Sequence, residues 1–426
     1  MTGDVSMGTR GIGLGGRGGG MLLRATLAQN VGTGSAFGGL GVSVLALQDR
    51  YHASLGSAAM ALSLTVLTMT ALGPLIAGLI ARWGLRRVMS AGALTSLIGY
   101  AVLAFAPSMP VALAACGLLI GPGAALFAVL PPAVLAGAWY PHARGRVMGI
   151  AYLPILATVI PLLGVNIIQN YGLTVFFLSI AALHLLLLPL MLGVAEPTTE
   201  GLDEQELVAE SASALRAPKI VIMGGALFWL IVLGDGILNG TAIAGAAHML
   251  PIVEGYGVSL ETGAVLLFVA GLSSILGSLL AGYASDRVGA AKTLGLAGIG
   301  FAAAWMIMGL TGWLPALTVS AFLIGLCGAS VFPPISALAV QLYGVEALPK
   351  VLGLFGVMTL PFTFAMSPAA GWLHDAFGGF ESVFVAIVTA CLIAAATFFG
   401  ISWHLTRKAE TDPDMPVTFL SSARSA

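Results

Sequence analysis

Apolar segments long enough to cross a lipid bilayer recur along the whole chain, separated by short stretches rich in charge, glycine or proline. A helix of roughly 20 apolar residues spans the hydrocarbon core, where every backbone polar group must be satisfied internally. Charged residues make up only 8% of the 426 residues, whereas a soluble domain carries roughly 25%. So little charge excludes a water-facing globular surface. The sequence therefore predicts an all-α integral membrane protein.

Charge and turn clusters divide the chain into twelve expected spans. The first six are 26–48, 56–80, 87–106, 110–137, 147–168 and 172–194, and the second six are 220–248, 260–283, 291–311, 315–341, 352–372 and 382–404. The fourth span is longer than a vertical helix needs, so we expect a tilt or a bend at Pro122, Pro131 and Pro132.

The spans imply two six-helix bundles, at 25–194 and 220–406. An acidic segment at 195–219 is expected to join them as a cytoplasmic linker. A glycine-rich stretch that cannot pack a core makes 1–24 an expected disordered cytoplasmic tail, with Met21 as an alternative start. A second cytoplasmic tail covers 407–426.

The basic residues predict how the chain is oriented. Twelve spans place both termini on one side of the membrane, and lysine and arginine concentrate in cytoplasmic loops. Of the 17 basic residues, Arg50 alone falls on the side opposite the termini. Both termini are therefore expected in the cytoplasm. The many alanine and glycine residues are compatible with a bacterial inner membrane.

The two halves of the chain repeat each other at a nearly constant spacing. ARWGLRR at 81–87 corresponds to DRVGAAK at 286–292, an offset of 286 − 81 = 205. Pro131 and Pro132 correspond to Pro333 and Pro334, an offset of 333 − 131 = 202. Parallel repeats of this kind build two similar bundles around a pseudo-two-fold axis along the membrane normal, with a cavity between them.

The segment GYASDRVGAAK at 282–292 resembles the signature of the major facilitator superfamily, in the loop between the second and third helices of a half. Three more segments resemble the branch of that family that contains monocarboxylate and oxalate/formate carriers. They are GAWYPHARGRVMGIA at 137–151, HMLPIVEGYGVS at 248–259 and SPAAGWLHDAFGGFESVF at 367–384. The resemblance covers Arg24 to about Arg407 and implies the major facilitator fold and transport without enzymatic activity.

The resemblance also implies a cytoplasmic gate. In the family, the signature aspartate faces the start of a helix in the other half. Here that aspartate is Asp286, and the N–H groups at the start of the fifth span carry the positive end of a helix dipole. The expected gate comprises Gly282, Asp286, Arg287, Gly289, Arg144 and Arg146. The alternative is that these charges only anchor helices and orient insertion.

Asp235 is the one acidic residue deep inside an expected span. A carboxyl group inside the membrane costs free energy and is by default a hypothesis of function. Burial favours its protonated form, so it could gain and lose a proton as access alternates. We expect Asp235 to couple protons or to hold a cationic group. The alternative is a protonated carboxyl that bonds to a neighbouring helix.

Other polar or aromatic residues in the spans are further candidates for lining the cavity, although amides in spans often join helices instead. They are Gln29 and Asn30 in the first span, Tyr152 and Asn166 in the fifth, and Trp229 and Asn239 in the seventh.

These features predict a secondary transporter that moves a small organic solute, most simply a monocarboxylate or related acid, with proton coupling. No lysine or arginine lies deep in any expected span to hold a carboxylate, so a proton-driven exporter of neutral or cationic hydrophobic compounds is the alternative. A non-transporting receptor is the alternative from another class. The six scattered histidines and the lack of a GxxxxGK[ST] loop argue against an enzyme or an ATP-driven pump. We expect a monomer in the lipid bilayer that binds its solute and protons, without a cofactor, a metal or nucleic acid.

Overall fold

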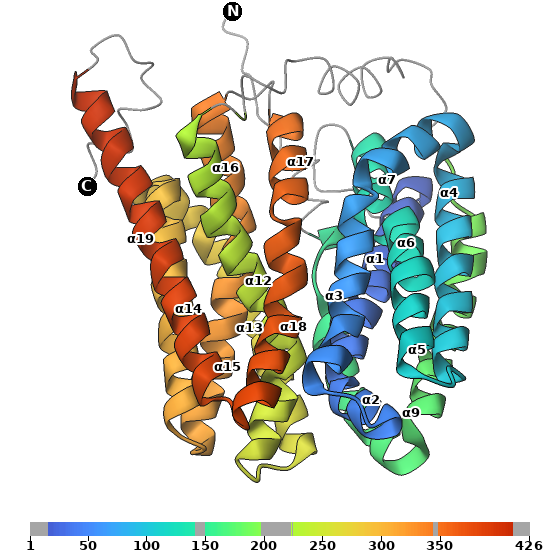
Figure 1. Cartoon of the computed structure of the whole chain (residues 1–426). Helices are drawn as coiled ribbons and strands as arrows, with labels where there is room; N and C mark the ends of the chain where they lie inside the picture. Colours follow the sequence, from blue (N-terminus) through green and yellow to red (C-terminus); the bar gives the residue numbers. More distant parts are fainter. Residues whose placement is uncertain (1–15, 141–149, 197–222, 224, 344–347, 412–426) are drawn as a thin grey trace, which may run out of the picture.

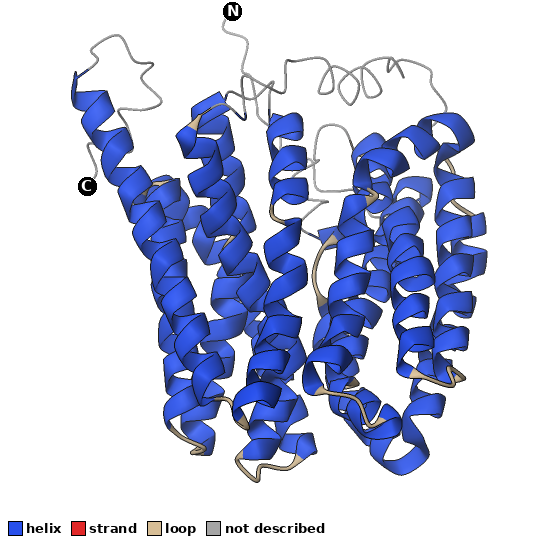
Figure 2. Cartoon of the chain, viewed as in Figure 1, coloured by secondary structure: helices blue, strands red, loops and turns tan. Residues whose placement is uncertain are grey.

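The computed structural model describes residues 16–140, 150–196, 223, 225–343 and 348–411, and all regular structure in these ranges is helical (Figure 2). Nine helices are long and apolar enough to cross a membrane, and a tenth span is the helix pair at 16–51, which bends by 55°. Two of the nine, α4 and α9, each contain two helices that meet at a glycine. The described chain therefore forms twelve spans, as the sequence predicts.

The first bundle holds the first six spans (Figure 1). The first span consists of α1 (Gly16–Thr33), the π-helical segment η1 (Gly34–Leu40) and α2 (Val44–Tyr51), the second of α3 (Leu55–Ala71) with the start of α4 (Gly73–Ala104), and the third of the rest of α4. The fourth span consists of α5 (Met109–Ala115), η2 (Cys116–Ile120), α6 (Gly121–Ala124), η3 (Ala125–Val129) and α7 (Leu130–Trp139). The two halves of α9 (Ile155–Leu192) are the fifth and sixth spans.

The second bundle holds the last six spans. They are α12 (Ala226–Gly255), α13 (Leu260–Val288), α14 (Ala290–Leu310), α15 (Leu314–Ala329) with α16 (Phe332–Tyr343), α17 (Leu348–Met358) with α18 (Leu360–Phe377), and α19 (Glu381–Thr411).

Local sequence explains where several helices start. The Ser54 and Ser259 hydroxyls accept hydrogen bonds from the N–H groups of Ser57 and Thr262, which caps α3 and α13. Proline occupies an early position in α4, α5, α7, α15 and α18, where its missing N–H has no helical partner to lose. The expected irregularity of the fourth span is present, because π-helical segments flank Pro122 and the backbone leaves helical geometry at Val129.

Two glycines make the internal repeat visible in the backbone. Gly84, at the turn inside α4, has φ 78° and ψ 158°, and Gly289, between α13 and α14, has φ 93° and ψ 148°. Their offset is 289 − 84 = 205, the spacing found in the sequence. Only glycine adopts this conformation without strain. The same tight turn thus connects the second and third helices of each half.

The two ends of the molecule differ in how the bundles share apolar cores. We call the end where α1 begins and α19 ends the inner end, and the opposite end the outer end (Figure 1). Near the outer end, Ala247 and Leu250 of α12 belong to the same core as Leu55 and Leu103 of the first bundle. Near the inner end, the described core of the first bundle contains no residue of the second bundle. The described bundles are therefore joined by a common core only toward the outer end.

The start of α1 corrects one expectation. The sequence predicts that the N-terminal tail extends to residue 24, but α1 begins at Gly16. A methyl group at Gly18 would lie 3.2 Å from the Tyr140 hydroxyl and 3.7 Å from the Trp139 ring at the end of α7. Glycine is a weak helix former, but here it allows α1 to approach the end of α7 closely. Helix propensities do not take such contacts between helices into account.

Candidate functional site

A cavity of about 190 Å³ lies between the two bundles. The first bundle contributes Phe37 and Gly38 of η1 and Ala157 and Pro161 of α9. The second contributes residues of α12, α13 and α15, most of them alanine or glycine, with Ser274 as a polar member. No lysine or arginine is present among the described residues that line it. The cavity is therefore lined mainly by small, apolar side chains.

Asp235 lies on the side of α12 that faces this cavity. Ala242, Ala246 and Met249 of α12 line the cavity, and Asp235 and Asn239 precede them at helical spacings of four and three residues. Residues so spaced share one face of a helix. Gly234 and Gly236, on either side, face Phe398 of α19 and Phe362 of α18 instead. Asp235 thus lies about 10 Å from Ala242 toward the inner end, at 1.5 Å per residue.

The Asp235 carboxyl is buried, with 6% of its surface exposed. Its hydrogen-bond partner is in the same helix: Asn239 Nδ2 lies 2.8 Å from Asp235 Oδ1 and 3.0 Å from the Asp235 carbonyl oxygen. Two residues that the sequence indicates separately are thus bonded to each other. The alternative expectation was a protonated carboxyl that bonds to a neighbouring helix. The described bond of Asp235 lies within its own helix instead.

Gln29 and Asn30, the two polar candidates of the first span, differ in their hydrogen bonds. Asn30 Oδ1 accepts a hydrogen bond from the Leu156 N–H at 3.0 Å, so this side chain joins α1 to the start of α9. Gln29 is buried and donates from Nε2 to the Thr33 hydroxyl, but its Oε1 has no partner within the described part of the chain. Gln29 is thus the amide of the pair with free hydrogen-bonding capacity.

The repeat places Gln29 and Asp235 at similar depth. A methyl group at Gly41 would lie 2.7 Å from the Ala246 carbonyl oxygen, so these positions meet between the bundles. Gln29 lies 12 residues before Gly41, and Asp235 lies 11 residues before Ala246. The two intervals differ by one residue, and the first includes the π-helical segment η1. The two polar groups therefore occupy corresponding positions on the first helix of each half.

None of the seven candidate residues is among the described residues that line the cavity, and the remaining three make contacts elsewhere. Trp229 is 49% exposed and donates to the Met223 carbonyl oxygen. Tyr152 donates to the Val129 carbonyl oxygen, at the irregular turn before α7. Asn166 is exposed, and its carbonyl oxygen accepts a hydrogen bond from Asn170.

The expected cytoplasmic gate is described only in part. Asp286 and Arg287 are exposed at the inner end of α13, and the Arg287 guanidinium lies 4.8 Å from the centre of the Tyr283 ring. A methyl group at Gly282 would meet open space. Arg144 and Arg146 lie outside the described residues, so the predicted contact with Asp286 stays a prediction.

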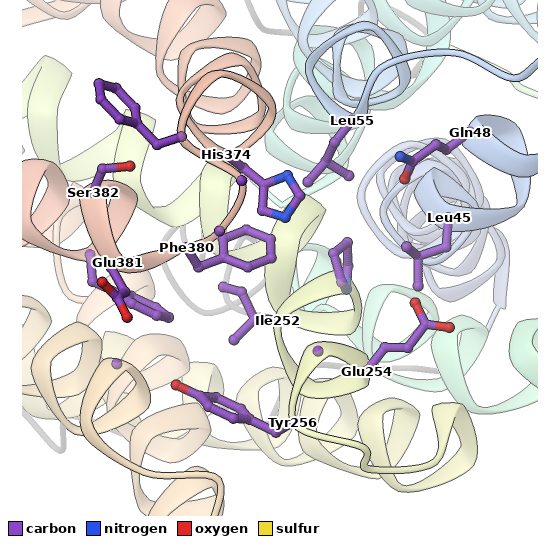
Figure 3. A pocket seen from close by; sticks show the side chains of 17 residues that line it. Leu45, Gln48, Leu55, Ile252, Glu254, Tyr256, His374, Phe380, Glu381 and Ser382 are labelled. Atoms are coloured by element: carbon purple, nitrogen blue, oxygen red, sulfur yellow. The ribbon is translucent and has the colours of Figure 1, made fainter.

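A larger pocket, about 870 Å³, opens at the outer end (Figure 3). Gln48 of α2, Glu254 and Tyr256 at the end of α12, and His374 and Glu381 around the turn from α18 to α19 line it. The sequence pattern does not predict a site in this region. Its polar residues lie at helix ends, where charged residues are ordinary, so composition gave no signal.

A match to a protein-family model identifies the family of this chain. The model described as Major Facilitator Superfamily matches residues 27–276 and again residues 236–417. The chain belongs to the Major Facilitator Superfamily. It is a multi-pass membrane protein and a secondary transporter, not an enzyme. The resemblance found in the sequence is confirmed at this level.

Curated relatives support the same assignment. The chain is 23% identical over 379 residues to monocarboxylate transporter 11 of Mus musculus, covering 85% of this chain and 82% of that protein. It is 30% identical over 103 residues to an uncharacterized transporter, y4wD, of Sinorhizobium fredii, covering 24% of this chain and 27% of that protein.

Solved structures of the family share the fold. The partially occluded inward-open xylose transporter XylE from E. coli superposes with a TM-score of 0.68 at 15% identity, covering 90% of this chain and 97% of that chain. A bacterial homologue of the human lysosomal transporter Spinster superposes with a TM-score of 0.67 at 15% identity, covering 90% of this chain and 97% of that chain. At these identities, the likeness establishes the arrangement of helices.

Proposed function

We propose that this transporter moves a small organic acid together with protons by alternating access, and that Asp235 is the coupling group. The observation that carries the proposal is the position of Asp235, which is buried two helical turns from Ala242, on the face of α12 that contributes Ala242, Ala246 and Met249 to the cavity. The similarity to monocarboxylate transporter 11 over most of the chain favours an acid as the solute.

The cavity favours a small solute that crosses without net negative charge. Ligand pockets usually measure about 300–1,000 Å³, and this cavity is smaller, about 190 Å³. No described lining residue carries a positive charge that would balance a carboxylate. An unpaired buried charge is costly. A monocarboxylate that binds as its neutral acid avoids that cost, and a proton on Asp235 removes the repulsion between two carboxylates.

One observation favours a second candidate function. A buried carboxyl on the same helix face as an apolar cavity also suits a lipophilic cation, because the carboxylate would supply the opposite charge. In that case the protein is a proton-driven exporter of hydrophobic cations or neutral compounds. The two functions differ in whether the proton moves with the solute or against it.

Flux measurements in proteoliposomes test the proposal and separate the two functions. We would impose a pH gradient and follow labelled short monocarboxylates, aromatic acids and lipophilic cations in wild type, Asp235→Asn and Asp49→Asn. Asp49 is an exposed carboxylate in α2 and serves as the matched control. We expect gradient-driven accumulation of an acid that Asp235→Asn abolishes, while exchange without a gradient survives. Unchanged gradient dependence in Asp235→Asn would overturn the coupling role.

Three further proposals complete the description. We infer that both termini lie in the cytoplasm, as the distribution of basic residues favours, and we propose that the protein is a monomer in a bacterial inner membrane. Asp286 and Arg287 would then form the cytoplasmic gate with Arg144 and Arg146. Gln29, with its free amide oxygen, is the candidate for a direct contact with the solute.

A further inference from the structure

The two bundles approach each other most closely at the outer end, where α3 crosses α18. A methyl group at Gly371 of α18 would lie 2.5 Å from the Cα and N atoms of Gly56 in α3, so only glycine fits there. The Trp372 ring packs over Gly56 in the same way. These contacts connect residues that lie more than 300 positions apart in the sequence.

A hydrogen bond at this crossing joins the bundles directly. The Gly56 N–H donates to Asp375 Oδ2 at 3.2 Å. Gly56 is the second residue of α3, and N–H groups in the first turn of a helix have no partner within the helix. Ser54 already caps the Ser57 N–H. Asp375 therefore supplies a second cap to a helix of the other bundle, and its negative charge faces the positive end of the α3 dipole.

The other carboxylate oxygen of Asp375 is held by its own bundle. His374 Nδ1 lies 3.2 Å from Asp375 Oδ1, and the His374 ring lies 4.3 Å from the Phe380 ring, centre to centre (Figure 3). Phe380 in turn lies 6.3 Å from the ring of His248 in α12. Asp375 is thus fixed on the second bundle and directed at the first.

We propose that Asp375 is an outer latch that holds the bundles together at the end opposite the chain termini. Alternating access requires this end to open in each cycle, so the cap on α3 must break and form again. The inference rests on transport by alternating access, but not on the identity of the solute or on a coupling role for Asp235. Asp375 performs this role together with Gly56, Gly371 and His374, and we call these four residues the outer latch.

Distance measurements by double electron–electron resonance test the outer latch without a known solute. Spin labels on Asp49→Cys in α2 and Glu381→Cys in α19 would report the separation of the bundles at the outer end. Both positions are exposed, and the three native cysteines are buried. In nanodiscs, we expect one short distance for the wild type and a second, longer population for Asp375→Ala. Relative to the wild type, the longer population should rise about tenfold or more, because a hydrogen bond to a charged group is worth about 1.5–3 kcal/mol and tenfold corresponds to about 1.4 kcal/mol.

Two further variants make the result decisive. Gly371→Ala should produce the same longer population through steric contact with Gly56, which shows that the labels detect opening. Glu254→Gln removes a carboxylate of the outer pocket that makes none of the described hydrogen bonds between the bundles, and it should leave the distances unchanged. If Gly371→Ala opens the outer end and Asp375→Ala does not, packing alone closes it and the latch role of Asp375 is wrong. If Asp235→Asn loses proton coupling but keeps the wild-type distances between the spin labels, the coupling role and the outer latch are separate, and the result does not contradict the outer latch.

Discussion

At the scale of single residues, the pair Asp235 and Asn239 shows how a carboxylate can be kept inside a membrane protein. The Asn239 amide donates to the carboxylate at 2.8 Å from the next turn of α12. A hydrogen bond to a charged group is worth about 1.5–3 kcal/mol. Asn239 therefore supports the ionised form of Asp235, which any mechanism of proton release requires.

Removal of this donor should slow transport without unfolding the protein. In Asn239→Leu the ionised carboxylate loses its partner, so the step that needs it becomes less favourable. We expect the maximal rate of gradient-driven transport to fall by about tenfold or more, as the loss of such a bond implies. Initial rates at saturating solute, with Asn170→Leu as a matched control on an exposed amide, measure the effect. Equal rates in wild type and Asn239→Leu would contradict the prediction.

Gln29 offers a second test at this scale. Its Oε1 is buried without a described partner, so Gln29→Leu removes a free acceptor and only one weak intrahelical bond to Thr33. If the solute donates to this oxygen, the KM should rise several-fold while the melting temperature changes little. Parallel uptake and thermal-shift measurements separate the two effects. A large loss of thermal stability with an unchanged KM would assign Gln29 to helix packing.

At the scale of elements, the glycine turns connect the repeat in the sequence to the fold. Gly84 and Gly289 adopt a backbone conformation that is essentially restricted to glycine, and a side chain there costs about 1–3 kcal/mol. Gly289→Ala should therefore lower the unfolding temperature of the purified protein. Gly282→Ala, seven residues earlier and inside α13 with open space around it, is the control. Equal melting curves for the two variants would show that the turn is not strained by a side chain.

The elements also show what the sequence could and could not predict. Hydropathy and the positions of charged loops placed all twelve spans, because each span must be continuous and apolar. The start of α1 was wrong, because contact with Tyr140 and Trp139 outweighs the low helix propensity of Gly18. Asn30 and Gln29 were indistinguishable as adjacent amides, and only their contacts separate a joint between helices from a free acceptor. Asp375 was overlooked because its partner, Gly56, is remote in the sequence and uses a backbone N–H.

At the scale of the whole molecule, the distribution of basic residues predicts the orientation in the membrane. Asp49 and Ala81 are exposed at the outer and inner ends. In intact cells, a membrane-impermeant maleimide should modify Asp49→Cys, whereas Ala81→Cys should react only after the membrane is permeabilised. The three native cysteines are buried, so the unmodified protein gives the background. The reverse pattern would place the termini outside.

The shared core at the outer end implies that the bundles must separate there during transport, and Gly41 tests how closely they must return. A methyl group at Gly41 would lie 2.7 Å from the Ala246 carbonyl oxygen of the other bundle, closer than unstrained atoms approach. Overpacking of this kind costs about 1–3 kcal/mol, and here the cost falls only on states in which the outer end is closed. Gly41→Ala should therefore reduce transport by about tenfold while each bundle stays folded. Gly400→Ala, at an exposed site of α19 with no neighbour, should transport normally. Full activity in Gly41→Ala would mean that this contact does not form in the transport cycle, and closure of the outer end would then depend on the shared apolar core and on the crossing of α3 and α18.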